Sequence, residues 1–468
     1  METARTAASP GKQLRRVLVP LALAQFICSF AGSNMNVMIN DMSRDLDTTV
    51  SGIQLAITIF LLVMAALMIP GGKLTDKYGR KRCFTLGLVI YGVGALMSAV
   101  APGLPFLILG NSIFEGVGTA LLIPPVYILV TMFFSDLTSR ARAFGAVSAA
   151  GGVGAATGPL IGGLITDAIS WRAAFVFQAL VVAAILWLAR DVRDPRPADP
   201  SLSFDIKGAV LSAVGLVLVV MGIMAAQSSL WLTVGLMAAG AAVLCWFLVS
   251  ARAKERAGGQ PLLSVTLFRN RTSNLGLVTQ NTQWLLLMGT SFVVAAYLQV
   301  VRGYDAIETG VIFTAATVGI LVASLAAERL AKRRAQRSLI ITGYVLSVVG
   351  VAVLLALVIG RPSAWAFAPG LLLIGIGVGV MLTPSVNVVQ SAFPEEQQGE
   401  ISGLSRSVSN LGSSLGTAVA GTVLVVGIAA TPSRAYGLAM VVLVAVSLVG
   451  LAAALLLPRT QTPATPTP

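Results

Sequence analysis

Fourteen apolar stretches follow one another along this chain, and each is long enough to cross a lipid bilayer as a helix, which takes ~20 mostly apolar residues. Charged residues make up only 11% of the chain, against roughly 25% in soluble domains. We therefore expect an all-α membrane protein. The stretches lie near residues 17–39, 50–71, 83–101, 105–132, 141–167, 172–190, 206–226, 229–250, 277–300, 308–327, 337–359, 366–389, 402–428 and 434–457.

The net charge of +13 could indicate a nucleic-acid partner, so its distribution matters. If both termini are cytoplasmic, all but five of the 32 Lys and Arg residues lie on the cytoplasmic side; the five are Arg44, Arg172, Arg302, Arg361 and Arg434. This bias is the positive-inside rule, which orients membrane helices. We therefore predict a multi-pass protein of the cell (plasma) membrane with both termini cytoplasmic, in contact with the bilayer and with no nucleic acid.

The sequence shows no constellation of residues that is typical of an enzyme. The chain has no histidine, and its three cysteines, Cys28, Cys83 and Cys245, lie in or beside apolar stretches. No nucleotide-binding loop of the Gly-x-x-x-x-Gly-Lys-Ser/Thr type is present. The sequence therefore predicts no enzyme, no metal site and no cofactor, and a transport process driven by this chain would draw on an ion gradient.

The chain carries a faint internal repeat. Three sets of residues recur at spacings of 252 to 259: Asp76 and Arg80 with Glu328 and Lys332; Gly154 and Gly158 with Gly412 and Gly416; and Gly116, Gly118 and Pro125 with Gly375, Gly377 and Pro384. Internal repeats are typical of transporters that move two halves around a central site. We predict a six-helix half at 1–190, a connector with an inserted helix pair at 191–250, and a connector, second six-helix half and short tail at 251–468.

The loop after the second stretch reads Gly72-Lys-Leu-Thr-Asp76-Lys-Tyr-Gly79-Arg80-Lys81-Arg82. It closely resembles the cytoplasmic signature of the major facilitator superfamily. Asp76 stands at a helix end, where Arg80 and a neighbouring helix N-terminus can engage it, while Gly72 allows close helix approach and Gly79 a tight turn. We predict that Gly72, Asp76, Gly79, Arg80 and Lys81 form a conformational latch; the alternative is a basic loop that only sets topology.

A second motif, in the fifth stretch, reads Gly154-Ala-Ala-Thr-Gly158-Pro159-Leu-Ile-Gly162-Gly163. It resembles the antiporter signature of the same family. Glycines spaced by four form a flat face that a neighbouring helix can approach, and Pro159 bends the helix. The alternative is plain helix packing. With the inserted pair, these motifs resemble the fourteen-helix drug–proton antiporter branch over nearly the whole chain, and the resemblance implies the major facilitator fold and proton-coupled efflux.

Two positions depart from that branch and point to Glu115. The aspartate usual in the first helix is replaced by Ala31, and the arginine and glutamine of the fourth helix by Ser112 and Glu115. Glu115 alone among the acids is mid-span, roughly 15 Å deep at ~1.5 Å per residue, where a lone carboxylate is costly unless neutralised. We predict proton coupling at Glu115, hydrogen-bonded by Asn111; the alternative is a permanently protonated side chain bonded to a neighbouring helix.

Polar side chains also share faces of two other stretches. Such a stripe on a membrane helix faces protein or water rather than lipid. We predict that these residues line a substrate cavity, the alternative being contacts with other helices only: Gln25, Ser29, Ser33, Asn36, Gln280, Gln283 and Trp284. Arg406, about a turn into the thirteenth stretch, is expected to reach the membrane surface or to pair with Glu400.

The function predicted from the sequence is secondary active transport by a monomer, as proton-coupled efflux of hydrophobic or cationic small molecules of the multidrug type. One alternative is an exporter of a specific endogenous metabolite or lipid, because a large apolar cavity suits both. The other is a non-transporting membrane receptor or scaffold, which the missing acid at Ala31 and the missing base at Ser112 allow.

Overall fold

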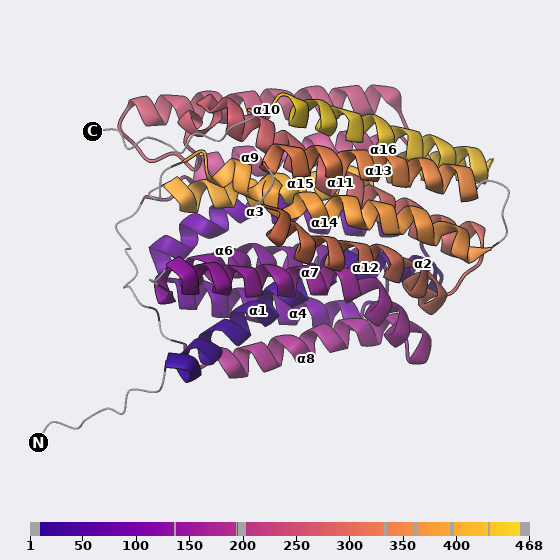
Figure 1. Ribbon diagram of the computed structural model, residues 1–468, viewed down its shortest axis with the longest axis horizontal. Helices are drawn as coiled ribbons and strands as arrows, with labels where there is room; N and C mark the ends of the chain where they lie inside the picture. The colour runs from indigo at the N-terminus through magenta and orange to yellow at the C-terminus, as the bar shows by residue number, and fades with distance from the viewer. Residues whose placement is uncertain are drawn as a thin grey trace, which may run out of the picture.

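The computed structural model describes residues 10–134, 137–192, 194, 203–331, 335–358, 363–393, 397–428 and 431–458. Within these ranges the protein is a bundle of long helices running side by side (Figure 1). The basic residue Lys332, part of the first repeat, lies outside the described residues, as does the proline-rich connector at 195–202.

The helices fall into three consecutive groups. The first contains α1 (Pro10–Asn34), η1 (Met35–Met38), α2 (Ile39–Asp45), α3 (Val50–Tyr78), α4 (Arg80–Ala99), α5 (Leu104–Leu107), η2 (Ile108–Glu115), α6 (Gly116–Phe133), α7 (Leu137–Ala168) and α8 (Trp171–Ala189). The inserted pair is α9 (Ile206–Ala225) and α10 (Leu230–Arg256). The last group contains η3 (Val265–Arg269), α11 (Arg271–Ala296), η4 (Tyr297–Val301), α12 (Ala306–Ala331), α13 (Gln336–Val358), η5 (Ala364–Phe367), α14 (Ala368–Gln390), α15 (Gln398–Ile428) and α16 (Pro432–Leu455).

Thirteen of the described spans are each long and apolar enough to cross a membrane. The fourteenth is α7, which is bent by 43° between its segments Gly145–Ala155 and Thr157–Ala168, close to Pro159. The prediction of an all-α membrane protein with fourteen crossings is therefore confirmed. Below, the near end of the bundle is the end where α1 begins and α16 ends, and the far end is the opposite one (Figure 1).

Glycines bring the helices together in the same way in both groups. A Cβ on Gly118 of α6 would lie 2.6 Å from the Tyr91 nitrogen and 2.8 Å from the Gly87 oxygen of α4. A Cβ on Gly377 of α14 would lie 2.5 Å and 2.9 Å from the matching backbone atoms, the Gly343 oxygen and the Ser347 nitrogen of α13. The repeated glycines of the sequence thus make equivalent close approaches in the two groups, which supports the predicted division into halves.

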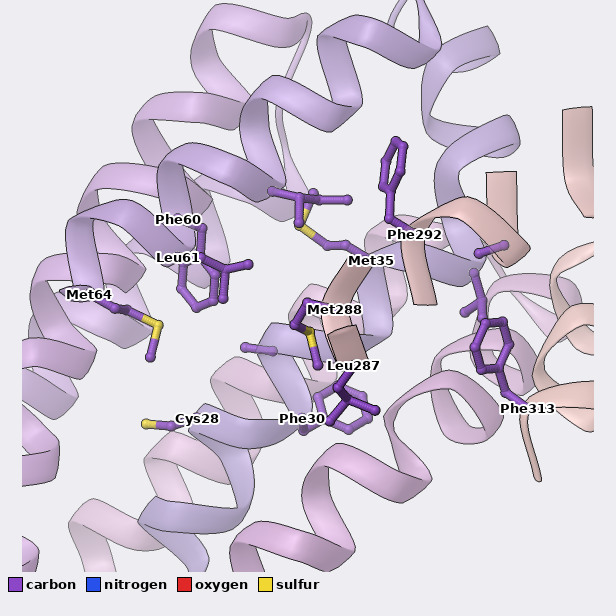
Figure 2. Packing of buried hydrophobic residues seen from close by; sticks show 14 of the residues in the cluster. Cys28, Phe30, Met35, Phe60, Leu61, Met64, Leu287, Met288, Phe292 and Phe313 are labelled. Carbon is purple, nitrogen blue, oxygen red and sulfur yellow. The ribbon is translucent and has the colours of Figure 1, made fainter. Parts of the chain in front are cut away.

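One apolar cluster runs across both groups. It joins side chains of α1 and α3 to side chains of α11 and α12 (Figure 2). The side chains of Phe30, Phe60 and Phe292 are each at most 1% exposed. Because burial in lipid gives helices no hydrophobic drive to associate, this interior is held by close van der Waals packing and by polar contacts between helices.

At the far end, amide side chains connect the two groups. Gln54 of α3 donates to the Thr417 oxygen of α15 at 2.9 Å, and Gln227, just after α9, donates both to Gln54 at 3.2 Å and to Thr422 of α15 at 3.3 Å. On the other side of the bundle, Gln299 of η4 donates to the Asn36 oxygen of η1 at 2.7 Å. The inserted pair therefore contacts both groups where they meet.

At the near end, Asp205 fixes the inserted pair to the next connector. Its carboxylate accepts hydrogen bonds from the backbone N–H groups of Gly208 and Leu262 and pairs with Lys254 at 3.2 Å. Burial alone would raise the pKa of the Asp205 carboxyl group. The three donors outweigh this effect and hold the pKa below its usual value.

We predict that Gly118→Ala and Gly377→Ala each destabilise the protein by about 1–3 kcal/mol, because the added Cβ meets backbone atoms that cannot move aside. The melting temperature of the purified protein in detergent measures the effect. Gly235→Ala is the matched control, since nothing lies within 4 Å of its Cβ position. Equal melting temperatures for Gly118→Ala and Gly235→Ala would contradict the packing described.

We also predict that the stability difference between the native protein and Asp205→Ala depends on pH. A carboxyl group whose pKa is depressed by folding stabilises the fold above its unfolded pKa of ~3.9. That stabilisation is lost as the pH falls through the lower, folded value. The difference in melting temperature should therefore be full at neutral pH and shrink as the pH is lowered past the ordinary aspartate range; a constant difference would refute the assignment.

Candidate functional site

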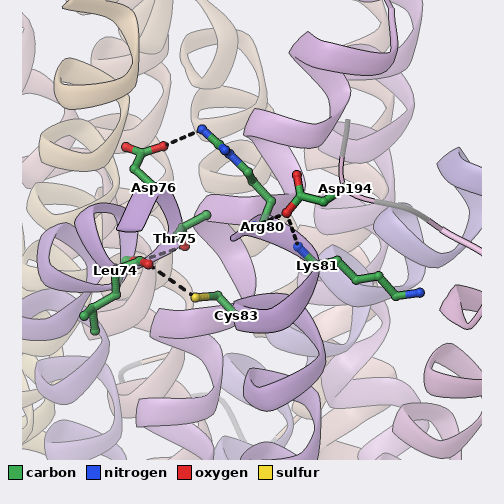
Figure 3. Close-up of polar contacts among 8 residues, drawn as sticks. Leu74, Thr75, Asp76, Arg80, Lys81, Cys83 and Asp194 are labelled. Atoms are coloured by element: carbon green, nitrogen blue, oxygen red, sulfur yellow. Dashed lines mark hydrogen bonds and ion pairs between the residues drawn. The ribbon is translucent and has the colours of Figure 1, made fainter. Parts of the chain in front are cut away.

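The turn between α3 and α4 holds the charged residues of the predicted latch (Figure 3). Arg80 pairs with Asp76 one turn earlier, at 3.0 Å between Nη2 and Oδ1. Gly79 joins the two helices with φ of +99°, a conformation that suits glycine because it has no Cβ. The pair therefore lies across the helix junction rather than within one helix.

Asp194 completes this cluster, and the sequence analysis missed it. Its Oδ2 accepts hydrogen bonds from the backbone nitrogens of Arg80 at 2.5 Å and Lys81 at 3.2 Å (Figure 3). The Lys81 ammonium donates to the Arg190 oxygen at 2.6 Å. The one available signal was the lack of a local cap: α4 starts after Gly79, which has no side chain to satisfy the free N–H groups of the first turn. A carboxylate from the end of the first group fills that role.

The predicted close approach at Gly72 is made by its neighbour. A Cβ on Gly72 would stand 3.8 Å from Pro124, an ordinary contact, whereas a Cβ on Gly71 would collide with the Ala120 backbone oxygen of α6. Gly71 is therefore the position at which α3 requires glycine in this arrangement.

The antiporter-like motif of α7 faces two helices. A Cβ on Gly154 or Gly158 would collide with α1, at the Phe26 oxygen and the Ser33 hydroxyl, and a Cβ on Gly162 would come within 3.1 Å of Asn34. A Cβ on the adjacent Gly163 would instead collide with the Ala306 oxygen of α12. The motif therefore packs α7 on α1 within the first group and also contacts the last group at the far end.

Glu115 is completely buried at the end of η2, a π-helical segment. The Ser98 hydroxyl of α4 donates to its Oε1 at 3.5 Å, Tyr91 of α4 is also within hydrogen-bonding reach, and its Oε2 has no partner among the described residues. Tyr91 in turn donates to Gln178 of α8 at 2.5 Å. Glu115 therefore belongs to a polar cluster inside the first group, turned toward α4 and α8.

Asn111 does not form the hydrogen bond predicted for it. The Asn111 side chain is buried, and both its amide atoms lack a partner among the described residues. The prediction assumed a regular helix in which residues four apart share a face, but η2 is π-helical and its wider turn shifts that register.

A polar network connects the two groups nearer the middle of the bundle. Arg406 of α15 donates to the hydroxyl of Tyr127 in α6 and lies over its ring, 4.8 Å from the centroid. Tyr127 donates to Gln25 of α1 at 3.1 Å, and Gln25 donates to Ser29 at 3.1 Å. The expected pairing of Arg406 with Glu400 is wrong, because Glu400 accepts from the Ser264 nitrogen instead.

Ser405, beside Arg406 in the chain, contacts a third predicted cavity residue, because its hydroxyl donates to Gln280 of α11 at 2.8 Å. We call these six residues the seam network: Gln25, Ser29, Tyr127, Gln280, Ser405 and Arg406. Three of the seven predicted cavity residues therefore belong to the seam network: Gln25 and Ser29 are linked to Arg406 through Tyr127, and Gln280 is bonded to its chain neighbour Ser405.

The other four predicted cavity residues lie outside the seam network. Ser33 donates to its own helix at the Phe30 oxygen, and Asn36 meets the last group through its backbone oxygen at the far end. Gln283 is buried with its Oε1 unpartnered among the described residues, and Trp284 packs on the apolar cluster. Their part in binding stays a prediction.

Two packed helical groups, a fourteen-span plan and a polar seam between the groups define a membrane transporter of the type whose halves move against each other. The family model of the Major Facilitator Superfamily matches residues 21–213, 207–417 and 282–468. The chain belongs to the Major Facilitator Superfamily.

Curated relatives cover most of the chain. The puromycin resistance protein pur8 of Streptomyces alboniger is 30% identical over 89% of this chain and 84% of its own. The probable actinorhodin transporter of Streptomyces coelicolor is 30% identical over 89% of this chain and 74% of its own. The multidrug resistance protein Stp of Mycobacterium tuberculosis is 28% identical over 88% of this chain and 76% of its own. Each of these relatives is named for drug resistance or for the transport of a small molecule.

Solved structures agree on the fold. A POT family transporter crystallised with 5-aminolevulinic acid has a TM-score of 0.66 at 15% identity, over 93% of this chain and 95% of that one. A peptide transporter POT in complex with sulfate has a TM-score of 0.67 at 17% identity, over 93% and 94%. At this identity the likeness concerns the architecture alone.

We predict that Asp194→Ala lowers the stability of the protein by about 1–2 kcal/mol, because two backbone N–H groups at the start of α4 lose a charged acceptor. Asp194→Asn should retain much of the stability, since an amide oxygen can still accept. Asp191→Ala is the control, because Asp191 is exposed and stands 3.9 Å from Arg190. Thermal unfolding measures all three, and a loss no larger than that of Asp191→Ala would count against the capping role.

Proposed function

We propose that this protein exports hydrophobic small molecules in exchange for protons, across the cell membrane, as a monomer with both termini cytoplasmic. The family and the relatives support export, and the distribution of Lys and Arg supports the orientation. The observation that carries proton exchange is Glu115, a fully buried carboxyl group with one oxygen unpartnered among the described residues. Such a group is costly in its charged form and suits a proton carrier.

The position of Glu115 supports a coupling route to the seam. The helix α6 starts directly after Glu115 and carries Tyr127, a seam residue, twelve positions further on, which is roughly 18 Å along a helix. Pro124 and Pro125 lie between the two and remove backbone hydrogen bonds from the helix. Loss of the Glu115 proton would leave a charge against α4, and a shift of α6 that relieves it would move Tyr127 relative to Arg406.

The latch residues and the antiporter-like motif have separate parts in this proposal. Asp76, Arg80, Lys81 and Gly79 brace the junction of α3 and α4 in this arrangement, and breaking the Asp76–Arg80 pair would release it. The glycines of α7 hold α1, which carries Gln25, against the first group. Both motifs then act on which conformation is populated, not on the substrate itself.

A second candidate is export of one specific metabolite. Two relatives are named as an actinorhodin transporter and a cephamycin export protein, of Streptomyces coelicolor and Amycolatopsis lactamdurans. The same seam would serve either a narrow or a broad set of compounds, so transport selectivity decides between the two.

We predict that Glu115→Gln reduces dye efflux to the background of an empty vector, because the amide cannot exchange a proton. Fluorescence with a panel of hydrophobic dyes measures this, as dye loss from energised cells or as dye uptake into energised inside-out vesicles. An uncoupler should abolish efflux by the native protein to the same extent. Glu308→Gln, at the far end of the bundle, is the matched control and should transport normally.

Two results would overturn parts of this proposal. Efflux that persists in Glu115→Gln and remains sensitive to the uncoupler would remove Glu115 from proton exchange while leaving export intact. Efflux by the native protein no faster than the empty vector, across the whole dye panel, would reject multidrug export and favour a specific metabolite.

A further inference from the structure

The charge that faces the seam between the two groups is positive. Arg406 reaches from α15 to Tyr127 of α6, and both side chains are half-buried, so a solute can approach them. The remaining seam residues are neutral amides and hydroxyls. The contacts described above, from Arg406 to Tyr127, from Tyr127 to Gln25, from Gln25 to Ser29 and from Ser405 to Gln280, join no acid.

The one mid-span acid accepts its hydrogen bond from Ser98 and not from Arg406. Glu115 is turned toward α4 and α8, where Ser98 and Tyr91 are its neighbours. The nearest acid along α15 is Glu400, which accepts a hydrogen bond from the Ser264 nitrogen at the near end of the bundle. A guanidinium within a membrane bundle is costly without a counter-charge, so the seam is electrostatically incomplete in the described structure.

The groups around Arg406 define what would complete it. A guanidinium presents a planar set of five N–H donors that matches a carboxylate or a phenolate oxygen. The Tyr127 ring, 4.8 Å from the guanidinium carbon, offers an aromatic face next to these donors. Gln25 of α1 accepts a hydrogen bond from Tyr127, and Gln280 of α11 accepts one from Ser405, the neighbour of Arg406 in the chain.

We propose that the seam network binds planar hydrophobic anions, namely aromatic compounds that carry a carboxylate or phenolate, with Arg406 as the residue that sets this preference. The proposal rests on the efflux function proposed above and narrows its hydrophobic substrates to anionic ones. The bound anion takes donors of Arg406 that otherwise face Tyr127, and so loosens the contact between α15 and α6. Binding and separation of the two groups are then one event.

The test compares three dyes of different charge in membrane vesicles: fluorescein as the anion, ethidium as the cation and Nile red as the neutral reference. The native protein should move fluorescein faster than ethidium. In Arg406→Gln the ratio of fluorescein to Nile red efflux should fall about tenfold, the size of one lost charge-assisted contact. Arg406→Lys should recover much of the ratio, and Arg406→Glu should shift preference toward ethidium.

One control separates this effect from general ones. Arg337→Gln removes a positive charge of α13 that donates to the Leu455 oxygen at the near end, and it should leave the ratio as in the native protein. The efflux ratio does not depend on how much protein is present. The amount of each variant in the membrane is measured in parallel to confirm that the variant is made.

The outcomes distinguish this proposal from the one on which it rests. Preference of the native protein for ethidium, or an unchanged ratio in Arg406→Gln, overturns the anion site and leaves efflux standing. If none of the three dyes moves faster than in vesicles with an empty vector, the efflux function itself fails, and the anion site fails with it.

Discussion

Close contact between helix backbones at glycine is the constraint on which this structure depends. Helices in lipid gain little from burying apolar surface, so their association relies on van der Waals contact and on polar pairs. The glycines of α6 and α14 allow such contact with α4 and α13, and those of α7 with α1. The seam network can form only because these contacts set where α1 and α6 lie relative to α15.

Features that depend on neighbouring residues could be predicted from the sequence. The spans follow from runs of apolar residues, and the pairing of Arg80 with Asp76 follows from a four-residue spacing at a helix end. The repeat was visible because the glycines of both halves must meet backbones in the same way. The spans and the glycine contacts have the regular helix geometry that the prediction assumed, whereas the Asp76–Arg80 pair forms across the turn at Gly79.

Features that depend on distant residues could not be predicted. Asp194 reaches the start of α4 from more than a hundred residues away, and nothing near Gly79 names its partner. The side of the helix on which Glu115 lies could not be predicted, because η2 is π-helical and its wider turn rotates its residues relative to a regular helix. The contact of Arg406 with Tyr127 depends on how the two groups face each other, and no local pattern in α15 encodes it.

The amide contacts at the far end have a consequence for how the molecule responds to its surroundings. Gln54, Gln227 and Gln299 connect the two groups through side chains that carry no charge at any physiological pH. The strength of these amide contacts is therefore the same in acidic and in alkaline solution. A response of the protein to a proton gradient would therefore come from groups other than these amides.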